Sequence, residues 1–236
     1  MAATVSTYFT NWNKLASSGP FPKQIYVQPM ILTLPQGKTM TVSIVWNGPA
    51  TAEYKEWVDK ISDLAPLVAP AMKTTTPLEH LAGLTAMLPR HVYAGTSRSV
   101  NLRGLELSPS AIERIIKHAD VMPAAGMLLN MHMLAGYACE EPFTPSIFRN
   151  REPHTMLEII GFAYTPEHVE AGKNWADEFA RDMKDAEGVM EGTYINLTWE
   201  DELDLAKIYG SAFGELKAMK REFDPTDVFK YAVPQL

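Results

Sequence analysis

The sequence predicts an α+β fold in which helices cover one face of a single, mostly antiparallel β-sheet. Three observations support this prediction. Two β-prone runs near the N-terminus are joined by a short loop, later strand-like and helical runs alternate irregularly, and the regular βαβ repeat of a doubly wound nucleotide-binding fold is missing. The 236 residues suit a single domain, spanning 1–236, whose core is large enough to need no disulfide or metal.

The first third of the chain predicts a hairpin and several helices. Residues 23–34 and 39–46 are rich in β-branched and aromatic side chains, and the Pro- and Gly-containing loop between them is typical of a hairpin. Pro29 has no N–H to donate to a strand ladder, so it predicts an edge position or a bulge. Helices are predicted at 4–15, 50–64 and 77–88.

Strands and helices alternate in the rest of the chain. Residues 90–102 predict an extended run. Ser108 and Pro109 predict the start of a helix, because serine is a favoured N-cap and proline suits the first helical position. The remaining predicted elements are strands at 124–137 and 154–164, a long helix at 166–187, a short strand at 192–197 and a helical region at 200–223.

The composition excludes several classes of function. The net charge is −7, and the 21 Lys and Arg residues are scattered among 28 Asp and Glu, which argues against a nucleic-acid partner. No apolar run approaches the ~20 residues that cross a bilayer, so we expect no membrane partner. The single cysteine, Cys139, permits no intrachain disulfide and favours a reducing compartment, so we expect a cytoplasmic protein.

Motifs that hold cofactors or metals are also missing. No G-x-G-x-x-G follows a strand, there is no P-loop, and the six histidines show no paired metal-ligand spacing. We therefore expect no metal site, and no cofactor bound by this chain alone.

The predicted strand at 154–164 carries a candidate acid–base group. Alternate residues of a strand share a face, so Glu158 lies with His154 and Met156 among apolar neighbours. Burial without a partner would raise the pKa of Glu158 and suit a general acid or base. Alternatively, Glu158 faces water or pairs with a Lys or Arg.

Other strands add polar candidates by the same alternation. His132 either shuttles protons or is a hydrogen-bonded core histidine, and Tyr194 and Asn196 either contact a substrate or bond across strands. Tyr26, Gln28 and Met30 share a face of the first strand. The predicted site therefore has catalytic Glu158, Tyr194 and His132, and substrate-binding Asn196, Asn130, His154, Tyr26, Gln28 and Met156.

The C-terminal stretch is the most specific signal in the sequence. It reads Tyr194-Ile195-Asn196, Tyr209-Gly210, Leu216-Lys217, Lys220-Arg221-Glu222-Phe223-Asp224-Pro225 and Val228-Phe229. This resembles the terminal signature of berberine bridge enzyme-like FAD-linked oxidases, and the earlier order of elements is similar over essentially the whole chain. The sequence departs from that signature at Asp227, where the family usually has Asn, and at Leu197, where it has a second aromatic residue.

The resemblance implies that the chain corresponds to the C-terminal substrate lobe of such an oxidase, an antiparallel sheet under helices, and that it lacks the N-terminal FAD-binding lobe. It implies a catalytic Glu or Gln near Glu158 and a cavity lined by the strand of Tyr194, near the flavin. Leu197 argues against oxidase-type base catalysis, and the tail is expected to be structural, with Phe229 packed back on the fold. The chain is then a flavin-free descendant, one partner of a separate flavin-binding chain, or a piece of a longer protein.

Three functions follow from these observations. The first is a flavin-free isomerase or cyclase of secondary metabolism that acts on a lipophilic small molecule, with Glu158 relaying a proton and cavity shape aiding catalysis. The second is the substrate-binding component of an oxidoreductase whose FAD comes from a partner lobe, with Glu158 or Tyr194 as the base. The third is a non-catalytic protein that binds lipophilic small molecules. Because apolar residues on the sheet face would otherwise meet water, we expect a second copy or a rearranged helix to cover it, with a homodimer as the default.

Overall fold

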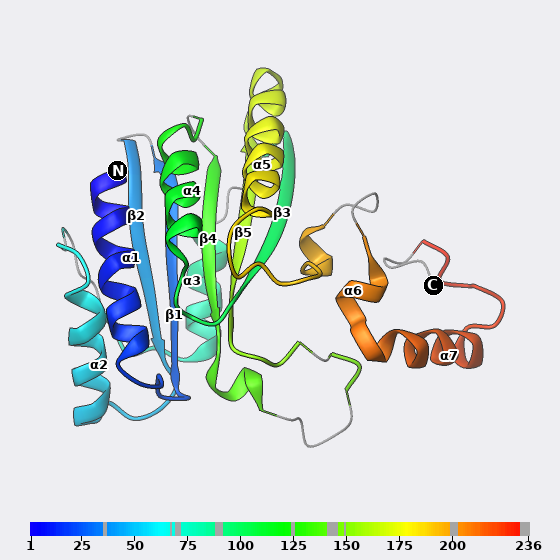
Figure 1. Ribbon diagram of the computed structural model, residues 1–236, viewed down its shortest axis with the longest axis horizontal. Helices are drawn as coiled ribbons and strands as arrows, with labels where there is room; N and C mark the ends of the chain where they lie inside the picture. The colour runs from blue at the N-terminus through cyan, green and yellow to red at the C-terminus, as the bar shows by residue number, and fades with distance from the viewer. Residues whose placement is uncertain are drawn as a thin grey trace.

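The computed structural model describes residues 1–34, 37–66, 68, 72–87, 92–123, 126–140, 146–148, 150–198 and 203–231. Its centre is a five-stranded antiparallel sheet with the strand order β2-β1-β4-β5-β3 (Figure 1). The strands are β1 (Ile25–Leu34), β2 (Gly37–Trp46), β3 (Ala94–Arg103), β4 (Met127–Leu134) and β5 (His154–Ala163). The predicted α+β class is therefore confirmed.

The N-terminal hairpin forms as predicted, and although β1 is an inner strand of the sheet, Pro29 lies where β1 is paired with β2 alone. β1 pairs with β2 without interruption from Ile25–Trp46 to Leu34–Gly37, and β2 is the edge strand. On the other side of β1, the ladder with β4 covers only Met30 to Leu32 and stops beside Pro29. The missing N–H of Pro29 is tolerated here because that part of β1 has no ladder partner in β4.

Helices cover one face of the sheet, as the sequence predicts. Figure 1 shows α1 (Ala2–Ser17), α4 (Pro109–Asp120) and α5 (Val169–Met183) in front of the strands. We call this the helix face, and we call the opposite side the network face. Figure 1 places α3 (Pro77–Met87) behind the sheet, on the side of the network face, while α2 (Ala52–Ser62) lies beside α1.

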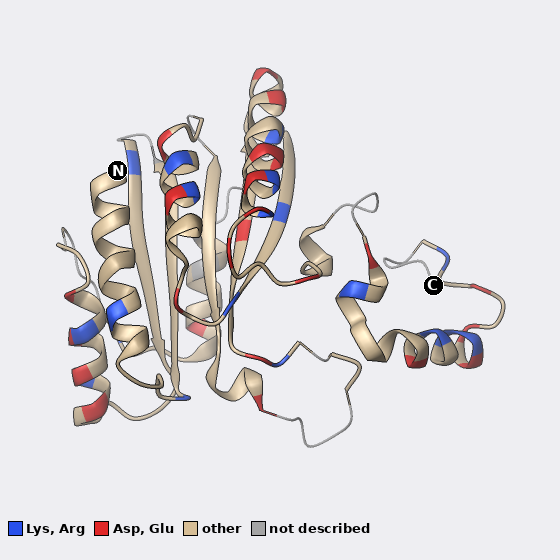
Figure 2. Cartoon of the chain, in the orientation of Figure 1, with Lys and Arg blue, Asp and Glu red and all other residues tan. Residues whose placement is uncertain are grey.

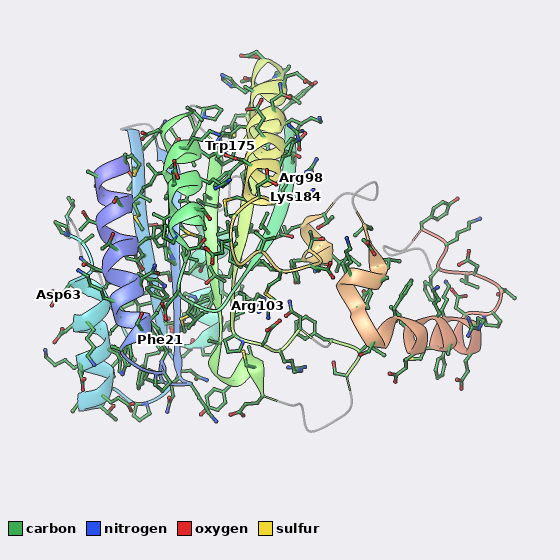
Figure 3. The ribbon with its side chains drawn as sticks, in the orientation of Figure 1. Phe21, Asp63, Arg98, Arg103, Trp175 and Lys184 are labelled. Carbon is green, nitrogen blue, oxygen red and sulfur yellow. The ribbon has the colours of Figure 1, made fainter. Side chains whose placement is uncertain are left out.

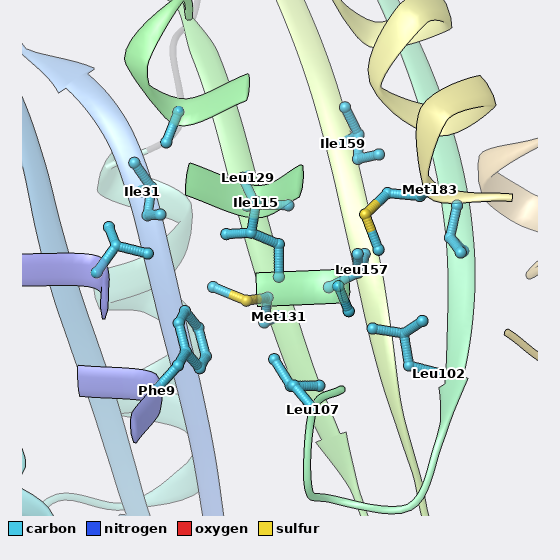
Figure 4. Close-up of a cluster of buried hydrophobic side chains, with 14 of the residues drawn as sticks. Phe9, Ile31, Leu102, Leu107, Ile115, Leu129, Met131, Leu157, Ile159 and Met183 are labelled. Carbon is cyan, nitrogen blue, oxygen red and sulfur yellow. The ribbon is translucent and has the colours of Figure 1, made fainter. Parts of the chain in front are cut away.

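The helix face holds the hydrophobic core (Figure 4). Strand alternation sends Leu129 and Met131 of β4, and Leu157 and Ile159 of β5, toward the helices, and each is at most 1% exposed. Phe9 of α1 closes the core beside β1. Several methionines fill this interior, where a flexible thioether adapts to irregular gaps.

A helix cap begins α4, and a largely buried ion pair joins α5 to the sheet. The hydroxyl of Ser108 accepts a hydrogen bond from the N–H of Ala111 and caps α4, as predicted. Arg98 of β3 forms a 2.6 Å ion pair with Asp177 of α5 where both side chains are largely buried, and Figure 3 shows Arg98 beside that helix. Because this pair joins β3 to α5, it stabilises the helix face and lies away from the network face.

A close backbone approach explains one glycine in β5. A Cβ atom on Gly161 would lie 2.6 Å from the carbonyl oxygen of Gly172 in α5. Gly161 therefore needs to be glycine, because any side chain there would push the helix away from the strand.

The predicted strand at 192–197 is wrong. Residues Gly188 to Met190 run along the outer edge of β3, where Met190 donates to the carbonyl of Asn101. The hydroxyl of Ser99 then accepts from the N–H of Tyr194, at 2.8 Å. Because a side chain takes the N–H of Tyr194, the strand-like pairing ends there, and a 3₁₀ turn follows at Ile195–Leu197.

The C-terminal region is helical, but it is interrupted. The structure has α6 (Leu205–Tyr209) and α7 (Phe213–Phe223), with a break at Gly210, whose φ of 52° lies in the left-handed region. Figure 1 shows these helices extending away from the sheet. We call the segment from α6 to Tyr231 the C-terminal arm.

The side chain of Phe229 is exposed, so the prediction that Phe229 packs back on the fold is wrong. Phe223 and Phe229 are 75% and 70% exposed. The carboxylate of Asp224 accepts hydrogen bonds from the N–H groups of Val228 and Phe229, and these bonds close a turn after α7. Charged residues gather on α2, α5 and α7, while the central strands are largely uncharged (Figure 2). Within the part of the chain that the structure describes, no helix is long and apolar enough to span a membrane.

Candidate functional site

Strand alternation brings five polar side chains together on the network face. Asn130 of β4 pairs with Met30 of β1 on one side and with Glu158 of β5 on the other. Residues at even positions of these strands therefore share one face. We call the resulting group the polar network, and its members are Tyr26, Gln28, Asn130, His132 and Glu158.

Hydrogen bonds connect all five side chains. The hydroxyl of Tyr26 lies 2.7 Å from Nδ1 of His132, and Nε2 of that ring lies 2.9 Å from Oε2 of Glu158. Asn130 donates through Nδ2 to the same carboxylate oxygen at 2.8 Å, and Gln28 donates to Oδ1 of Asn130 at 2.7 Å. Glu158 is therefore the centre, with one branch that leads to a phenol and another that leads to an amide.

Glu158 is not the unpartnered buried carboxylate whose pKa would be raised, because His132 and Asn130 both bond to it. Burial alone would raise that pKa, but hydrogen bonds from His132 and Asn130, together with the positive charge that His132 can carry, lower it below its ordinary value. Glu158 is therefore ionised at neutral pH. These partners are not apparent in the sequence around Glu158, because both donors come from β4.

The carboxylate keeps one oxygen available. Both donors bind Oε2, and no side chain or backbone group among the described residues donates to Oε1. The side chains of Glu158 and His132 are 18% and 20% exposed, so both are accessible from the network face.

Burial raises the pKa of the Tyr26 phenol, and the negative charge of Glu158 raises it further, to about 12. Tyr26 is therefore a neutral hydroxyl that can donate a hydrogen bond to His132 at neutral pH.

The structure does not join Tyr194 and Asn196 to the polar network. They lie at the 3₁₀ turn that follows residues 188–190, the segment along the outer edge of β3. There the amide of Asn196 donates to the hydroxyl of Tyr194 at 3.1 Å. The main chain of Tyr194 is held by Ser99, which is the cross-strand neighbour of Glu158. Tyr194 therefore lies on the β3 side of the network, with 40% of its surface exposed.

His154 and Met156 share the network face but are buried, with 2% and 7% of their surfaces exposed. Nδ1 of His154 is 2.8 Å from the carbonyl oxygen of Glu152, and burial lowers the pKa of its ring. Neither side chain is open to a ligand in this conformation.

Sequence reasoning missed Ser99 and Asn101. Both lie on β3 facing the same side as Glu158, and Oδ1 of the buried Asn101 has no hydrogen-bond partner in the described part of the chain. Alternation along the predicted run 90–102 would have identified them, because it places Ser97, Ser99 and Asn101 on one face.

A hollow of about 390 Å³ lies elsewhere, at the end of the sheet, between Phe21, Arg103, Leu105, Gly136 and Pro153. It includes no residue of the polar network, so the network lies on an accessible face rather than in this hollow. Among the residues that the structure describes, no group of three or more His, Cys, Asp and Glu is placed to hold a metal.

Comparisons with known proteins give a consistent result. No family model matches the sequence. The chain is 26% identical over 198 residues to the FAD-linked oxidoreductase aurO of Gibberella zeae, a match that covers 83% of this chain and 38% of aurO.

Solved structures share the fold at lower sequence identity. Aclacinomycin oxidoreductase matches with a TM-score of 0.75 and 16% identity, over 97% of this chain and 51% of that one. BBE-like 1 of Physcomitrella patens matches with a TM-score of 0.71 and 14% identity, over 95% and 49%. The glycopeptide hexose oxidase DBV29, complexed with teicoplanin, matches with a TM-score of 0.75 and 15% identity, over 99% and 52%. The chain thus spans about half the length of these structures.

Proposed function

We propose that this chain, a relative of the FAD-linked oxidoreductases with the fold of about half of a berberine bridge enzyme-like oxidase, is the substrate-binding half of an FAD-dependent oxidoreductase. Its substrate is a small molecule that carries a hydroxyl group, and its FAD is held by a separate flavin-binding lobe. Enzymes with this fold include ones named for aclacinomycin and crystallised with teicoplanin or pregilvocarcin, which supports a natural-product substrate.

The polar network is the observation that carries this proposal. An acid–base pair, Glu158 and His132, lies half-buried on the sheet face opposite the main helices, with a phenol bonded to it. Met30, Ile160 and Phe162 lie on the same face and are partly buried, so an apolar substrate can pack beside the polar groups. This combination suits a ligand with an apolar body and a hydroxyl that must lose a proton.

The described residues can form the substrate side of a flavin site, but they do not form a binding site for the whole cofactor. The network face offers proton acceptors and hydrogen-bond partners, but no glycine-rich turn at a helix N-terminus, which would bind a pyrophosphate, lies among the described residues. When bound, a flavin supplies a hydride acceptor for the oxidation of a carbinol carbon. This chain orients the hydroxyl and takes up its proton.

The test is to purify the affinity-tagged chain from its source cells and measure the visible flavin absorbance of the product. We expect the chain to co-elute with a flavoprotein. We also expect that an alcohol which the complex oxidises will bleach the flavin when it is added without oxygen. Glu158→Gln should retain the flavin band and slow the bleaching about a hundredfold or more, since general acid–base groups contribute 10²–10⁴. Glu170→Gln, on the exposed surface of α5, is the matched control and should bleach at the original rate.

Purification of the active chain alone and without flavin absorbance would contradict this function. It would favour a second candidate, a flavin-free isomerase or cyclase, which one observation also supports: the polar network is complete within a single chain. In that case a second copy of the chain is the expected cover of the network face. Sedimentation of the purified protein distinguishes a homodimer from a complex with a flavoprotein.

A further inference from the structure

We propose that Tyr26, His132 and Glu158 form a directed proton relay in which the phenol of Tyr26 is the catalytic group that meets the substrate hydroxyl. This inference rests on the proposed function and specifies which atom of the polar network performs the proton step. It assigns the catalytic contact to Tyr26, and it makes Glu158 a positioning residue that acts through His132.

The direction of the relay follows from the hydrogen-bond roles. An ionised carboxylate only accepts, so Nε2 of His132, at 2.9 Å from Oε2 of Glu158, must carry the ring proton. In the neutral ring, Nδ1 then has a lone pair and no proton. The hydroxyl of Tyr26, 2.7 Å from Nδ1, must therefore donate to it. The three side chains thus hold a single tautomer, with every donor aimed toward Glu158.

A second branch keeps Glu158 in this role. Gln28 donates to Oδ1 of Asn130, which turns the amide so that its Nδ2 faces Glu158. Asn130 is buried, with 6% of its surface exposed, and so its amide has little freedom to reverse. This branch favours the charged carboxylate, and a charged carboxylate fixes the ring proton of His132 on Nε2.

The proton step is balanced within these groups. The substrate O–H bond breaks as its proton passes to the oxygen of Tyr26, and the phenol's own proton passes to Nδ1 of His132. The ring becomes an imidazolium, which Glu158 stabilises with its negative charge, and the substrate is left as an alkoxide. Glu158 itself is a weak base here, because its hydrogen bonds favour the ionised form. Its role in this step is therefore to stabilise the charged ring rather than to take the proton.

Besides burial, the charge that acts on the phenol of Tyr26 is that of Glu158. On β2, its cross-strand neighbour is the apolar Val45. On the β3 side, Tyr194 is anchored by Ser99, and its hydroxyl is bonded to Asn196. The state of Tyr26 therefore depends mainly on His132 and Glu158.

The first experiment needs no flavin partner and no substrate. Nitrogen-15 NMR of the histidine-labelled chain at neutral pH should show His132 as the tautomer with its proton on Nε2. Tyr26→Phe should shift the Nδ1 signal, because a hydrogen bond is lost, while Tyr164→Phe, an exposed tyrosine, should leave it unchanged. A proton on Nδ1, or an Nδ1 signal unaffected by Tyr26→Phe, would overturn the relay even if the chain proves to be an oxidoreductase subunit.

The second experiment is kinetic and uses the assembled enzyme. Tyr26→Phe should lower kcat about a hundredfold or more with little change in KM, and His132→Ala should lose as much and regain part of it when imidazole is added. Unchanged kcat in Tyr26→Phe, with the folded state verified by an unaltered Tm, would show that the substrate meets another group. Wild-type enzyme that lacks oxidase activity but shows the predicted His132 tautomer would refute the proposed function and leave the relay intact.

Discussion

The two faces of the sheet are made by the same strands but carry side chains of different kinds. Along β5, Leu157 and Ile159 are fully buried beneath the helices, while Glu158, between them, lies on the network face with a bonded histidine. Because successive side chains of a strand point to opposite faces, a core residue and a residue of the polar network are neighbours in the sequence. We expect substitutions on the helix face to change the free energy of unfolding, and those on the network face to change turnover.

The largest effect should come from the helix face. Leu157→Ala removes a fully buried side chain and leaves a cavity, so the free energy of unfolding should fall by about 2–5 kcal/mol. Urea unfolding followed by circular dichroism measures it. Leu78→Ala is the control, since that leucine of α3 is 76% exposed and should change stability by about 0.5 kcal/mol or less. An equal decrease in the free energy of unfolding of both variants would contradict the view that the helix face holds the stabilising core.

Glu158→Gln tests the network face at the neighbouring position. The amide keeps the shape and the hydrogen bonds to His132 and Asn130 but removes the charge that fixes the ring tautomer, so kcat should fall about a hundredfold. The midpoint of urea unfolding should move much less than in Leu157→Ala. A large loss of stability with unchanged kcat would show that Glu158 has a structural role instead.

The pH dependence of stability sharpens this point. Since the folded state lowers the pKa of Glu158 below 4.5, the ionised carboxylate stabilises the fold above that pH, and the contribution disappears as the pH falls through the folded value. Wild-type protein and Glu158→Gln should therefore differ in unfolding free energy at neutral pH and converge in acid. Urea titrations from about pH 6 to about pH 3 measure the difference. A difference that grows toward acid would mean that the pKa is raised.

The smallest effect is expected in the C-terminal arm. Phe223→Ser and Phe229→Ser replace side chains that are 75% and 70% exposed, so each should change the unfolding free energy by about 0.5 kcal/mol or less. Thermal melts of the two variants beside wild type test this. A drop in Tm as large as that of Leu157→Ala would show that the arm packs on the body in solution.

The sequence predicts more of the sheet than of the site. Alternation was enough to place Tyr26, Gln28, His132 and Glu158 on the correct faces of their strands, because the period of a strand is local. It gave no register, so the contact between Glu158 and His132, 26 residues apart, was unpredictable, and with it the sign of the pKa shift. Long-range bonds of this kind decide the chemistry of the network face.

The errors in the last third of the chain have a similar cause. The run at 192–197 has the residues of a strand, but the hydroxyl of Ser99, 95 residues earlier, takes the N–H of Tyr194. Phe229 lies in a motif typical of a packed tail, yet its N–H bonds to the carboxylate of Asp224 and its side chain is exposed. In both cases one side chain competes with the backbone pattern that the local sequence favours.

The course of residues 188–190 along the outer edge of β3 has a consequence for self-association. Those residues occupy part of the hydrogen-bonding edge of that strand, whereas the outer edge of β2 has no strand partner among the described residues. An unpaired edge is a template for a strand of another molecule. Growth of this sheet by strand addition, whether into an ordered assembly or an aggregate, is therefore favoured at the outer edge of β2 over the part of β3 that residues 188–190 cover.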